Sequence, residues 1–302
     1  MQITPMSAFG YEITDVDLAA ASGEELGEVK AAFADAGLIV VRGQTLSEAQ
    51  HIAFAERYGE INVNRFFTAH PAYRKIALVT KEPDQQMNIG LHWHTDHSYD
   101  ETPALGSMLL AKELPPRGGD TCFASMYSLY DRLSPGLQRT LEGMNAVHSA
   151  KHVFGTMNKP VVVDAMVKGS EGDRIGNASA ADALPDPVHP VVIRHPLSGK
   201  KSLYINPQFT LHFEGWTPEE SRPLMDYLFE LGKSENEMCR VEWRAGTMTF
   251  WDNRATWHSA MNDYHGFRRH MHRITIEGCA LEAAVGGVFE GAFDEDCAMS
   301  GA

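Results

Sequence analysis

The first part of the chain contains a helical pattern followed by a short apolar run. Leu26, Val29 and Phe33 recur at the spacing of one helix face, and the pattern stops at Gly37. Residues 38–41, Leu-Ile-Val-Val, are all apolar, which is typical of a short strand. The sequence therefore predicts a helix followed directly by a strand.

Capping residues locate further helices. Ser47 and Gln50 have the spacing of a capping box, in which the two side chains satisfy backbone amides at a helix start. Gly59 is well placed to end this helix, because glycine readily adopts the backbone conformation found after a last helical turn. The Ser-Pro pair at 134–135 and the Thr-Pro-Glu-Glu run at 217–220 predict two more helix starts.

Strand patterns dominate the second half of the chain. Residues 191–194 and 203–205 are joined through a turn at 196–199, Pro-Leu-Ser-Gly, and predict a β-hairpin. Residues 248–251 form another strand-like run. No repeat or linker divides the sequence, so we expect residues 1–302 to form a single domain that is mainly β with flanking helices.

Two histidines and one aspartate have the composition of an iron site. His94 and Asp96 are two residues apart, so on an extended strand both side chains point to the same face. His258 follows the run at 248–251, and we expect this run to lie beside the first strand, which brings in the third ligand. Two imidazoles and one carboxylate on one face of a metal leave the opposite positions open, as a non-haem Fe(II) oxygenase requires.

Other assignments of the 14 histidines remain open at this point. His92 and His94 alternate in the same way as His94 and Asp96, so a zinc site built from these two histidines and a third one is the main alternative. The His94 and Asp96 side chains could also form an ordinary hydrogen-bonded pair. These alternatives correspond to a zinc-dependent hydrolase and to a non-catalytic binding module of the same fold.

Composition restricts the partners and the location. The formal net charge of −14 argues against nucleic acid and anionic membranes, because both are bound by basic patches. The N-terminus lacks a signal-peptide pattern, and no stretch approaches the roughly 20 apolar residues of a membrane span. The 4 cysteines show no metal-binding spacing, and we expect a reducing, cytoplasmic setting. The expected partner is a small-molecule substrate.

A series of motifs makes a family recognisable. The chain resembles the taurine dioxygenase and chlorophenoxyacetate dioxygenase family of Fe(II)/2-oxoglutarate-dependent oxygenases. The resemblance extends from about residue 8 to residue 278, which is nearly the whole chain. In chain order, the matching segments and residues are 93–96, 111–115, 118–121, 189–192, 251–254, His258, 263–264, Arg269 and Arg273.

The resemblance implies a fold and specific roles. The fold is a jelly roll, also called a double-stranded β-helix, with helices packed outside. His94, Asp96 and His258 are then the iron ligands, and O2 is a cosubstrate. Thr121 and Arg269 hold the distal carboxylate of the second cosubstrate, 2-oxoglutarate; the planar guanidinium fork of an arginine suits a carboxylate.

The same resemblance suggests substrate contacts. Arg273 lies four residues after Arg269 in an apparent strand, so both can face one cavity. In taurine dioxygenases the second of these arginines meets the sulfonate of the substrate. Arg273 is therefore expected to bind an anionic substrate group, with a cosubstrate contact as the alternative. The other positions expected at the substrate are Asn64, His97, Phe154 and Phe209.

Two departures argue against taurine itself. Residues 62–65, Asn-Val-Asn-Arg, stand where taurine-specific members carry a histidine for the sulfonate, and residues 88–91 lack their Asp-Asn pair for the amine. Residues 125–127, Ser-Met-Tyr, look closer to the members that cleave phenoxyalkanoate ethers. We expect hydroxylation of a small, anionic, phenoxyalkanoate-like or sulfonate-like substrate, after which the product can collapse and release a leaving group.

Two segments have no fixed role. Residues 159–190 contain glycines and prolines among small and acidic residues, and form either a lid over the pocket or a surface insertion. Residues 281–302 carry acids but no Lys or Arg. We expect this tail to lie outside the barrel, at a contact between the subunits of a homo-oligomer.

Overall fold

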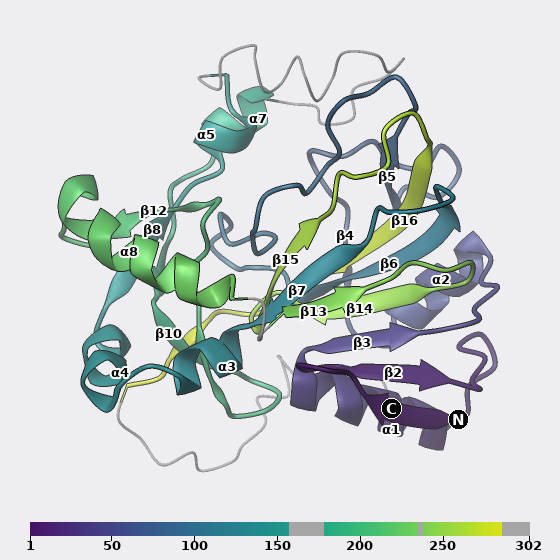
Figure 1. The fold of residues 1–302 in the computed structure, drawn as a ribbon, viewed down its shortest axis with the longest axis horizontal. Coiled ribbons are helices and arrows are strands. Elements are labelled where there is room, and N and C mark those ends of the chain that lie inside the picture. Colours follow the sequence, from purple (N-terminus) through teal and green to yellow (C-terminus); the bar gives the residue numbers. More distant parts are fainter. Residues whose placement is uncertain (157–177, 235–237, 286–302) are drawn as a thin grey trace.

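The computed structural model describes residues 1–156, 178–234 and 238–285 and shows a β-rich protein (Figure 1). Within these residues the largest layer is an 8-stranded sheet, antiparallel except for the parallel pair β2 and β3. Its strand order is β1 (Gln2–Pro5), β2 (Tyr11–Thr14), β3 (Leu38–Val41), β14 (Met248–Asp252), β6 (Gly106–Glu113), β16 (Arg269–Ile276) and β4 (Ile61–Asn62), while β5 (Ala77–Lys81) also pairs with β16.

Three smaller sheets complete the β-structure of the described residues. They are, in strand order, β13 (Met238–Val241), β7 (Thr121–Ser125) and β15 (Thr256–Ala260); β12 (Thr210–Phe213), β8 (Asn145–His148) and β9 (Val188–Pro190); β11 (Lys201–Leu203), β10 (Val192–Arg194) and β17 (Glu282–Ala283). The first of them faces the large sheet: Phe123 of β7 and Trp251 of β14 lie in one buried cluster, with ring centroids 5.6 Å apart. These facing sheets form the jelly roll that the sequence analysis expected.

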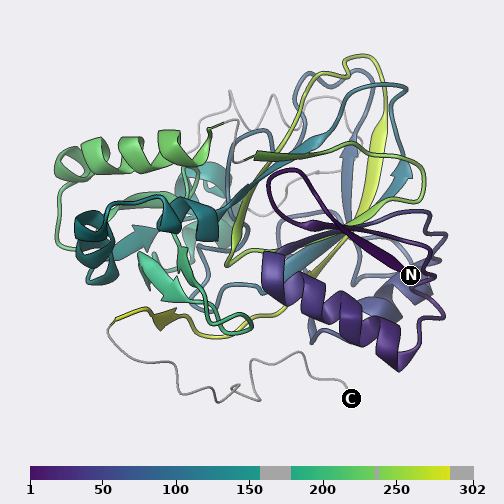
Figure 2. The same ribbon diagram turned by 60° about the horizontal axis from the view of Figure 1, so that its bottom comes forward.

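Helices cover the outside of the sheets. The helix α1 (Gly23–Ala36) packs on the outer face of the large sheet, where Phe33 stacks on Phe250 of β14 with ring centroids 3.9 Å apart. The described helices besides α1 are α2 (Glu48–Ala55), α3 (Met126–Asp131), α4 (Pro135–Glu142), α5 (Lys151–Phe154), α7 (Ala178–Asp182) and α8 (Pro218–Gly232). The helices α3, α4 and α8 gather around the smaller sheets, away from α1 (Figure 2).

Strand β3 explains the uninterrupted apolar run near the N-terminus. Ile39 and Val41 pack into the outer cluster under α1, whereas Leu38 and Val40 pack into the inner cluster between the sheets. Because successive side chains of a strand point to opposite faces, a strand covered on both faces needs apolar residues at every position.

Most predicted helix boundaries are confirmed. Gly37 follows α1 with a φ of 69°, in the left-handed region that favours glycine. Ser47 and Thr217 form capping boxes, and Ser134 caps α4. Gly59 was expected to end α2, but the helix ends earlier and a further turn separates them.

The predicted hairpin is confirmed, since β10 pairs with β11 in antiparallel register. The prediction that the run at 248–251 lies beside the His94 segment was wrong. Strand β14 pairs with β3 on one edge and β6 on the other, so it has no free edge for the His94 segment. Instead, His94 forms an isolated antiparallel bridge with His258 of β15. The third histidine is therefore brought in by its own strand.

The two segments without an assigned role are only partly within the described residues. Of the predicted lid, residues 159–177 lie outside them, whereas its end contains α7 and β9, and β9 pairs with β8. Residues 286–302 of the tail also lie outside. The beginning of the tail is strand β17, which pairs with β10 and so belongs to a sheet.

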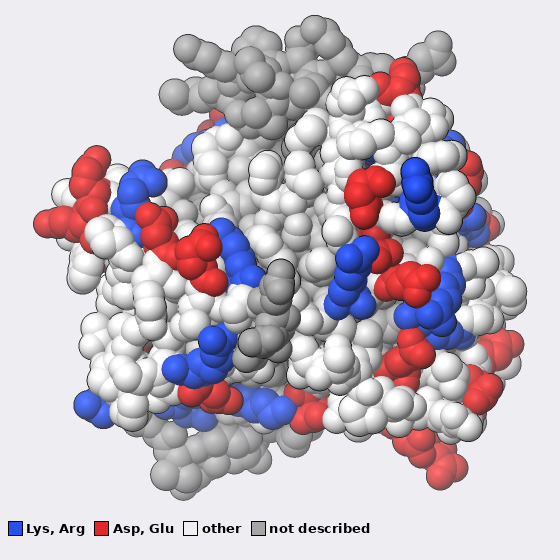
Figure 3. All heavy atoms as spheres, viewed as in Figure 1, with Lys and Arg blue, Asp and Glu red and all other residues white. Residues whose placement is uncertain are grey.

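On the face of the molecule drawn in Figure 3, acidic and basic side chains are interspersed. Exposed ion pairs such as Lys200 with Asp35, at 2.7 Å, reflect this mixture. In the described part of the chain, no helix is long and apolar enough to cross a membrane. Cys122 and Cys239 are free thiols, whereas Cys279 is disulfide-bonded, which the sequence analysis did not expect.

His51 of α2 is fully buried, and among the described residues its two ring nitrogens have no hydrogen-bond partner. Burial is the main reason that the pKa of His51 is lowered to about 3; nearby His272 and Lys112 add to the shift, and Glu48 opposes it. The folded pKa is thus below the unfolded value of 6.5. Between these values the unfolded chain binds more protons, so stability falls as the pH falls.

We expect a His51→Leu variant to lose less stability in acid than the wild-type protein. Between pH 7 and pH 5, protonation of His51 in the unfolded state lowers the free energy of unfolding by about 2 kcal/mol, since each pH unit below the unfolded pKa costs about 1.4 kcal/mol. Urea unfolding of both proteins at both pH values measures the difference. Equal losses in the two proteins would contradict the assignment.

Candidate active site

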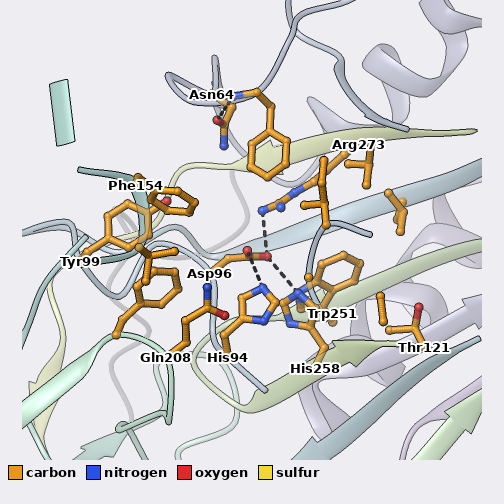
Figure 4. A pocket seen from close by; sticks show the side chains of 18 of the residues that line it. Asn64, His94, Asp96, Tyr99, Thr121, Phe154, Gln208, Trp251, His258 and Arg273 are labelled. Atoms are coloured by element: carbon orange, nitrogen blue, oxygen red, sulfur yellow. Dashed lines mark hydrogen bonds and ion pairs between the residues drawn. The ribbon is translucent and has the colours of Figure 1, made fainter. Parts of the chain in front are cut away.

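His94, Asp96 and His258 come together in a cavity between the facing sheets. One ligand atom from each lies within 4.8 Å of the other two. The two Asp96 oxygens are each 3.5 Å from a histidine Nε2, Oδ1 from that of His94 and Oδ2 from that of His258. Figure 4 shows the two rings and the carboxylate pointing toward one another. Such a set could hold a divalent metal ion with the opposite positions open to the cavity.

The backbone holds the two histidines side by side. The His94 N–H donates to the His258 carbonyl at 3.1 Å, and the His258 N–H donates back at 2.9 Å. Between the ligands, the Thr95 hydroxyl points away and donates to the Thr256 carbonyl at 2.8 Å. His94 Nδ1 lies 2.7 Å from the His92 carbonyl, and a proton on Nδ1 leaves the Nε2 lone pair free for a metal.

This arrangement differs from the zinc alternative considered above. The His92 ring is exposed, and it is the His92 carbonyl oxygen that lies 2.7 Å from His94 Nδ1. The groups of potential metal ligands found among the described residues do not contain His92.

Asp96 is buried but surrounded by positive charge. The Arg273 guanidinium lies 2.8 Å from Asp96 Oδ2 and donates to Ser107 at 2.9 Å. Burial alone would raise the pKa of Asp96, but Arg273 first, and then His258 and His94, outweigh it and hold the pKa well below its usual value. The carboxylate is therefore ionised, as a metal ligand must be.

The part of the cavity around Arg269 is suited to an anion. Arg269 is buried, and its Nε and Nη2 have no hydrogen-bond partner within the described ranges. The Arg269 guanidinium lies 5.4 Å from the centre of the Trp243 ring. Burial lowers the pKa of Arg269, and the nearby Tyr264 and Asp120 oppose this shift. A buried guanidinium without a carboxylate partner is costly unless an anionic ligand pairs with it.

Thr121 lines the same cavity. The Trp243 indole N–H donates to the Thr121 hydroxyl oxygen at 3.0 Å. This contact occupies an acceptor site of the hydroxyl, so the Thr121 proton is available to donate to a ligand. In Figure 4, Thr121 lies on the opposite side of the metal-ligand group from Phe154 and Tyr99.

The half of the cavity around Phe154 is mainly aromatic. The ring centroid of Phe209 lies 4.8 Å from that of Tyr99 and 5.8 Å from that of Phe154. Asn64 also lines the cavity, and its Oδ1 accepts two backbone N–H groups at 2.8 and 3.0 Å, which fix its orientation. Of the five positions expected at the substrate, four line one cavity: Asn64, Phe154, Phe209 and Arg273.

The fifth position, His97, lies behind Asn64 instead of in the lining. Its Nε2 is 3.4 Å from Asn64 Nδ2, and its Nδ1 is 2.8 Å from Asp100 Oδ2. The backbone of His97 has a φ of 59°, which is uncommon outside glycine and is the kind of strain found at functional sites. The structure thus places His97 where it supports a cavity residue.

Several side chains at the site were not predicted from the sequence. Tyr99 and Gln208 both line the aromatic half, and Trp243 holds Thr121 and Arg269 in place. No residue pattern marks these positions, because each enters the site through long-range packing.

A second group of ligand-type side chains lies outside the cavity. Glu48, His70 and His272 also have ligand atoms within 4.8 Å of one another. However, His70 Nδ1 accepts two backbone N–H groups, both at 3.2 Å, so the ring proton sits on Nε2 and neither nitrogen offers a lone pair to a metal. Glu48 is paired with Lys112 at 3.1 Å. Two of the three side chains therefore already have other partners.

A jelly roll whose interior holds a buried His-Asp-His group beside an unpaired arginine defines a class of protein, the non-haem metal oxygenases. The family model described as "Taurine catabolism dioxygenase TauD, TfdA family" matches residues 2–275. The chain therefore belongs to the TauD and TfdA family of dioxygenases.

Known relatives and structures agree with this family. The α-ketoglutarate-dependent 2,4-dichlorophenoxyacetate dioxygenase of Cupriavidus pinatubonensis is 33% identical over 288 residues, covering 90% of this chain and 94% of that protein. The (S)-phenoxypropionate/α-ketoglutarate-dioxygenase of Sphingobium herbicidovorans is 29% identical, covering 85% and 88%. The crystal structure of a taurine dioxygenase from Burkholderia xenovorans matches with a TM-score of 0.75 and 28% identity, covering 95% and 94%. The protein is an α-ketoglutarate (2-oxoglutarate)-dependent dioxygenase that uses Fe(II), 2-oxoglutarate and O2.

Proposed function

We propose that this dioxygenase holds Fe(II) with His94, Asp96 and His258 and binds the distal carboxylate of 2-oxoglutarate with Thr121 and Arg269. The observation that carries the proposal is the buried, unpaired guanidinium of Arg269 in the same cavity as the three metal ligands. When bound, the iron and 2-oxoglutarate supply the oxidising chemistry. The protein positions the substrate carbon and keeps bulk water out.

We propose hydroxylation of a small substrate that combines an apolar ring with an anionic group. Phe154, Phe209 and Tyr99 provide a surface for a ring, and Arg273 lines the cavity with a buried Nε that lacks a hydrogen-bond partner in the described residues. Two relatives are named for phenoxyalkanoate substrates, and another is named as a sulfonate dioxygenase. Hydroxylation of a carbon next to an ether oxygen would give a hemiacetal, which collapses to a carbonyl compound and an alcohol.

We also propose that residues 1–302 form one catalytic domain, and that the protein is a cytoplasmic homo-oligomer. Support for one domain comes from the cavity, which side chains from Asn64 to Arg273 line together. His97 is assigned to positioning Asn64, from the contact between their side chains.

The decisive experiment is succinate release from 2-oxoglutarate under air, with Fe(II) and ascorbate. A panel of phenoxyalkanoates, sulfonates and other small carboxylates is tested, and stimulation by a panel member with matching substrate loss supports the proposal. Turnover of a substrate without O2 would favour a zinc hydrolase instead. Binding of 2-oxoglutarate without turnover of any panel member would reject the proposed substrate class.

The role of Arg273 can be tested with a charged and a neutral ligand of the same shape. We expect Arg273→Gln to lower kcat/KM for phenoxyacetate by about 100-fold, because a buried charged contact is worth about 3 kcal/mol. The loss for phenoxyacetamide should be much smaller, since this amide carries no anion. Because Arg273 also contacts Asp96, the bound iron of each variant is measured. Equal losses for both compounds at full iron occupancy would contradict an anion contact.

A further inference from the structure

Gln208 brings an unsatisfied polar group into the aromatic half of the cavity. It lines the cavity, and its Oε1 is buried without a hydrogen-bond partner among the described residues. The next residue, Phe209, has its ring centroid 6.2 Å from that of His94, so this part of the wall lies beside the metal ligands. Figure 4 shows the Gln208 side chain on the same side as Tyr99 and Phe154. A buried acceptor without a donor is unfavourable unless a ligand supplies the donor.

The side chain of Asn206 holds the backbone at Gln208 in place. Asn206 Oδ1 accepts the backbone N–H groups of Gln208 at 3.2 Å and Phe209 at 2.9 Å. The Asn206 amide in turn donates to the hydroxyl of Ser98 at 2.9 Å, and Ser98 is two residues after the ligand Asp96. This turn is thereby connected to the metal-ligand segment, so the backbone that carries the Gln208 side chain has a fixed position.

The other carboxamide in the cavity lining, that of Asn64, cannot take the same role. Asn64 Oδ1 already accepts two backbone N–H groups, whereas Gln208 Oε1 accepts none from the described residues. We infer that Gln208 is a specificity-determining residue, and that the preferred substrate carries a neutral hydrogen-bond donor, a hydroxyl or an N–H, on its ring. This inference deepens the proposed function and rests on it for the reaction, but the binding preference can be measured separately.

The first test uses two neutral probes of the same shape, indole and indene, of which only indole has an N–H. Both are titrated by calorimetry into the anaerobic protein loaded with Fe(II) and 2-oxoglutarate. We expect the wild type to bind indole about fivefold more tightly, as one neutral hydrogen bond provides, and Gln208→Leu to bind both equally. Gln2→Leu, the same substitution at an exposed position of β1, should keep the preference. Equal binding by the wild type, or a preference retained in Gln208→Leu, would overturn the inference.

The second test compares succinate formation with phenoxyacetate and with 3- and 4-hydroxyphenoxyacetate. We expect one hydroxylated compound to have about five- to tenfold higher kcat/KM than phenoxyacetate in the wild type, and this advantage to disappear in Gln208→Leu. The readout is the ratio of kcat/KM between the hydroxylated compounds and phenoxyacetate within each protein, so it does not depend on how the variant changes phenoxyacetate turnover itself. A uniform loss with all three compounds would assign Gln208 a general structural role and reject this inference. Absence of turnover with all three compounds, together with an indole preference, would instead reject the proposed substrate class.

Discussion

Asp96→Ala is expected to abolish succinate formation that depends on Fe(II). Loss of a residue that merely supports a metal ligand already weakens metal binding by about 10–100-fold, so loss of the ligand itself should weaken it further. The variant also leaves Arg273 buried without the carboxylate that lies 2.8 Å away, which is expected to cost about 3–5 kcal/mol of stability. Bound iron and succinate are measured on the same samples.

Because Asp96→Ala combines two effects, Asp96→Asn separates them. The amide keeps the size of the side chain and an oxygen for Arg273, but it removes the charge that the metal requires. We expect folded protein with little bound iron and only background turnover. Glu24→Ala, at an exposed carboxylate in the first turn of α1, serves as a control and should behave as the wild type. Full turnover in both Asp96 variants would refute the assignment of this ligand.

Arg269→Ala is expected to weaken 2-oxoglutarate binding by roughly 150-fold, which corresponds to about 3 kcal/mol for a buried charge pair. The physical reason is the unpaired guanidinium, for which no other described side chain supplies a hydrogen-bonding partner at Nε or Nη2. Calorimetric titration of the anaerobic, iron-loaded protein measures the affinity directly. Arg269→Lys should recover only part of it, since lysine keeps the charge but loses the planar fork.

The adjacent Arg268 offers a matched control. It points to the opposite side of the chain, where it forms ion pairs with Glu82 and Glu113. Exposed pairs of this kind contribute about 0–1 kcal/mol, so Arg268→Ala should bind 2-oxoglutarate as the wild type does. Equal losses of affinity in the Arg268 and Arg269 variants would show that the effect is general electrostatics and not a specific contact.

Local patterns were sufficient for many elements of this fold. Capping at Ser47, Ser134 and Thr217 depends on hydrogen bonds within four residues, so the sequence already contains both partners. Gly59 shows the limit of such rules. A glycine near a helix end predicts a stop, but the α2 helix ended earlier, and an additional turn carries the chain to that residue.

The amino-acid sequence alone established which chemical groups the chain carries: a His-x-Asp pair with its side chains on one face, a distant histidine, and two arginines at the spacing of one strand face. Which of these groups lie together depends on the folding of the whole chain. The bridge between His94 and His258 joins segments far apart in the chain, and β14 was excluded because its edges are paired with β3 and β6. The same long-range packing placed His97 behind Asn64 and Gln208 in the cavity. Side-chain type and local spacing are properties of a few neighbouring residues, whereas strand pairing and burial depend on the whole chain, which is why only the folded structure reveals them.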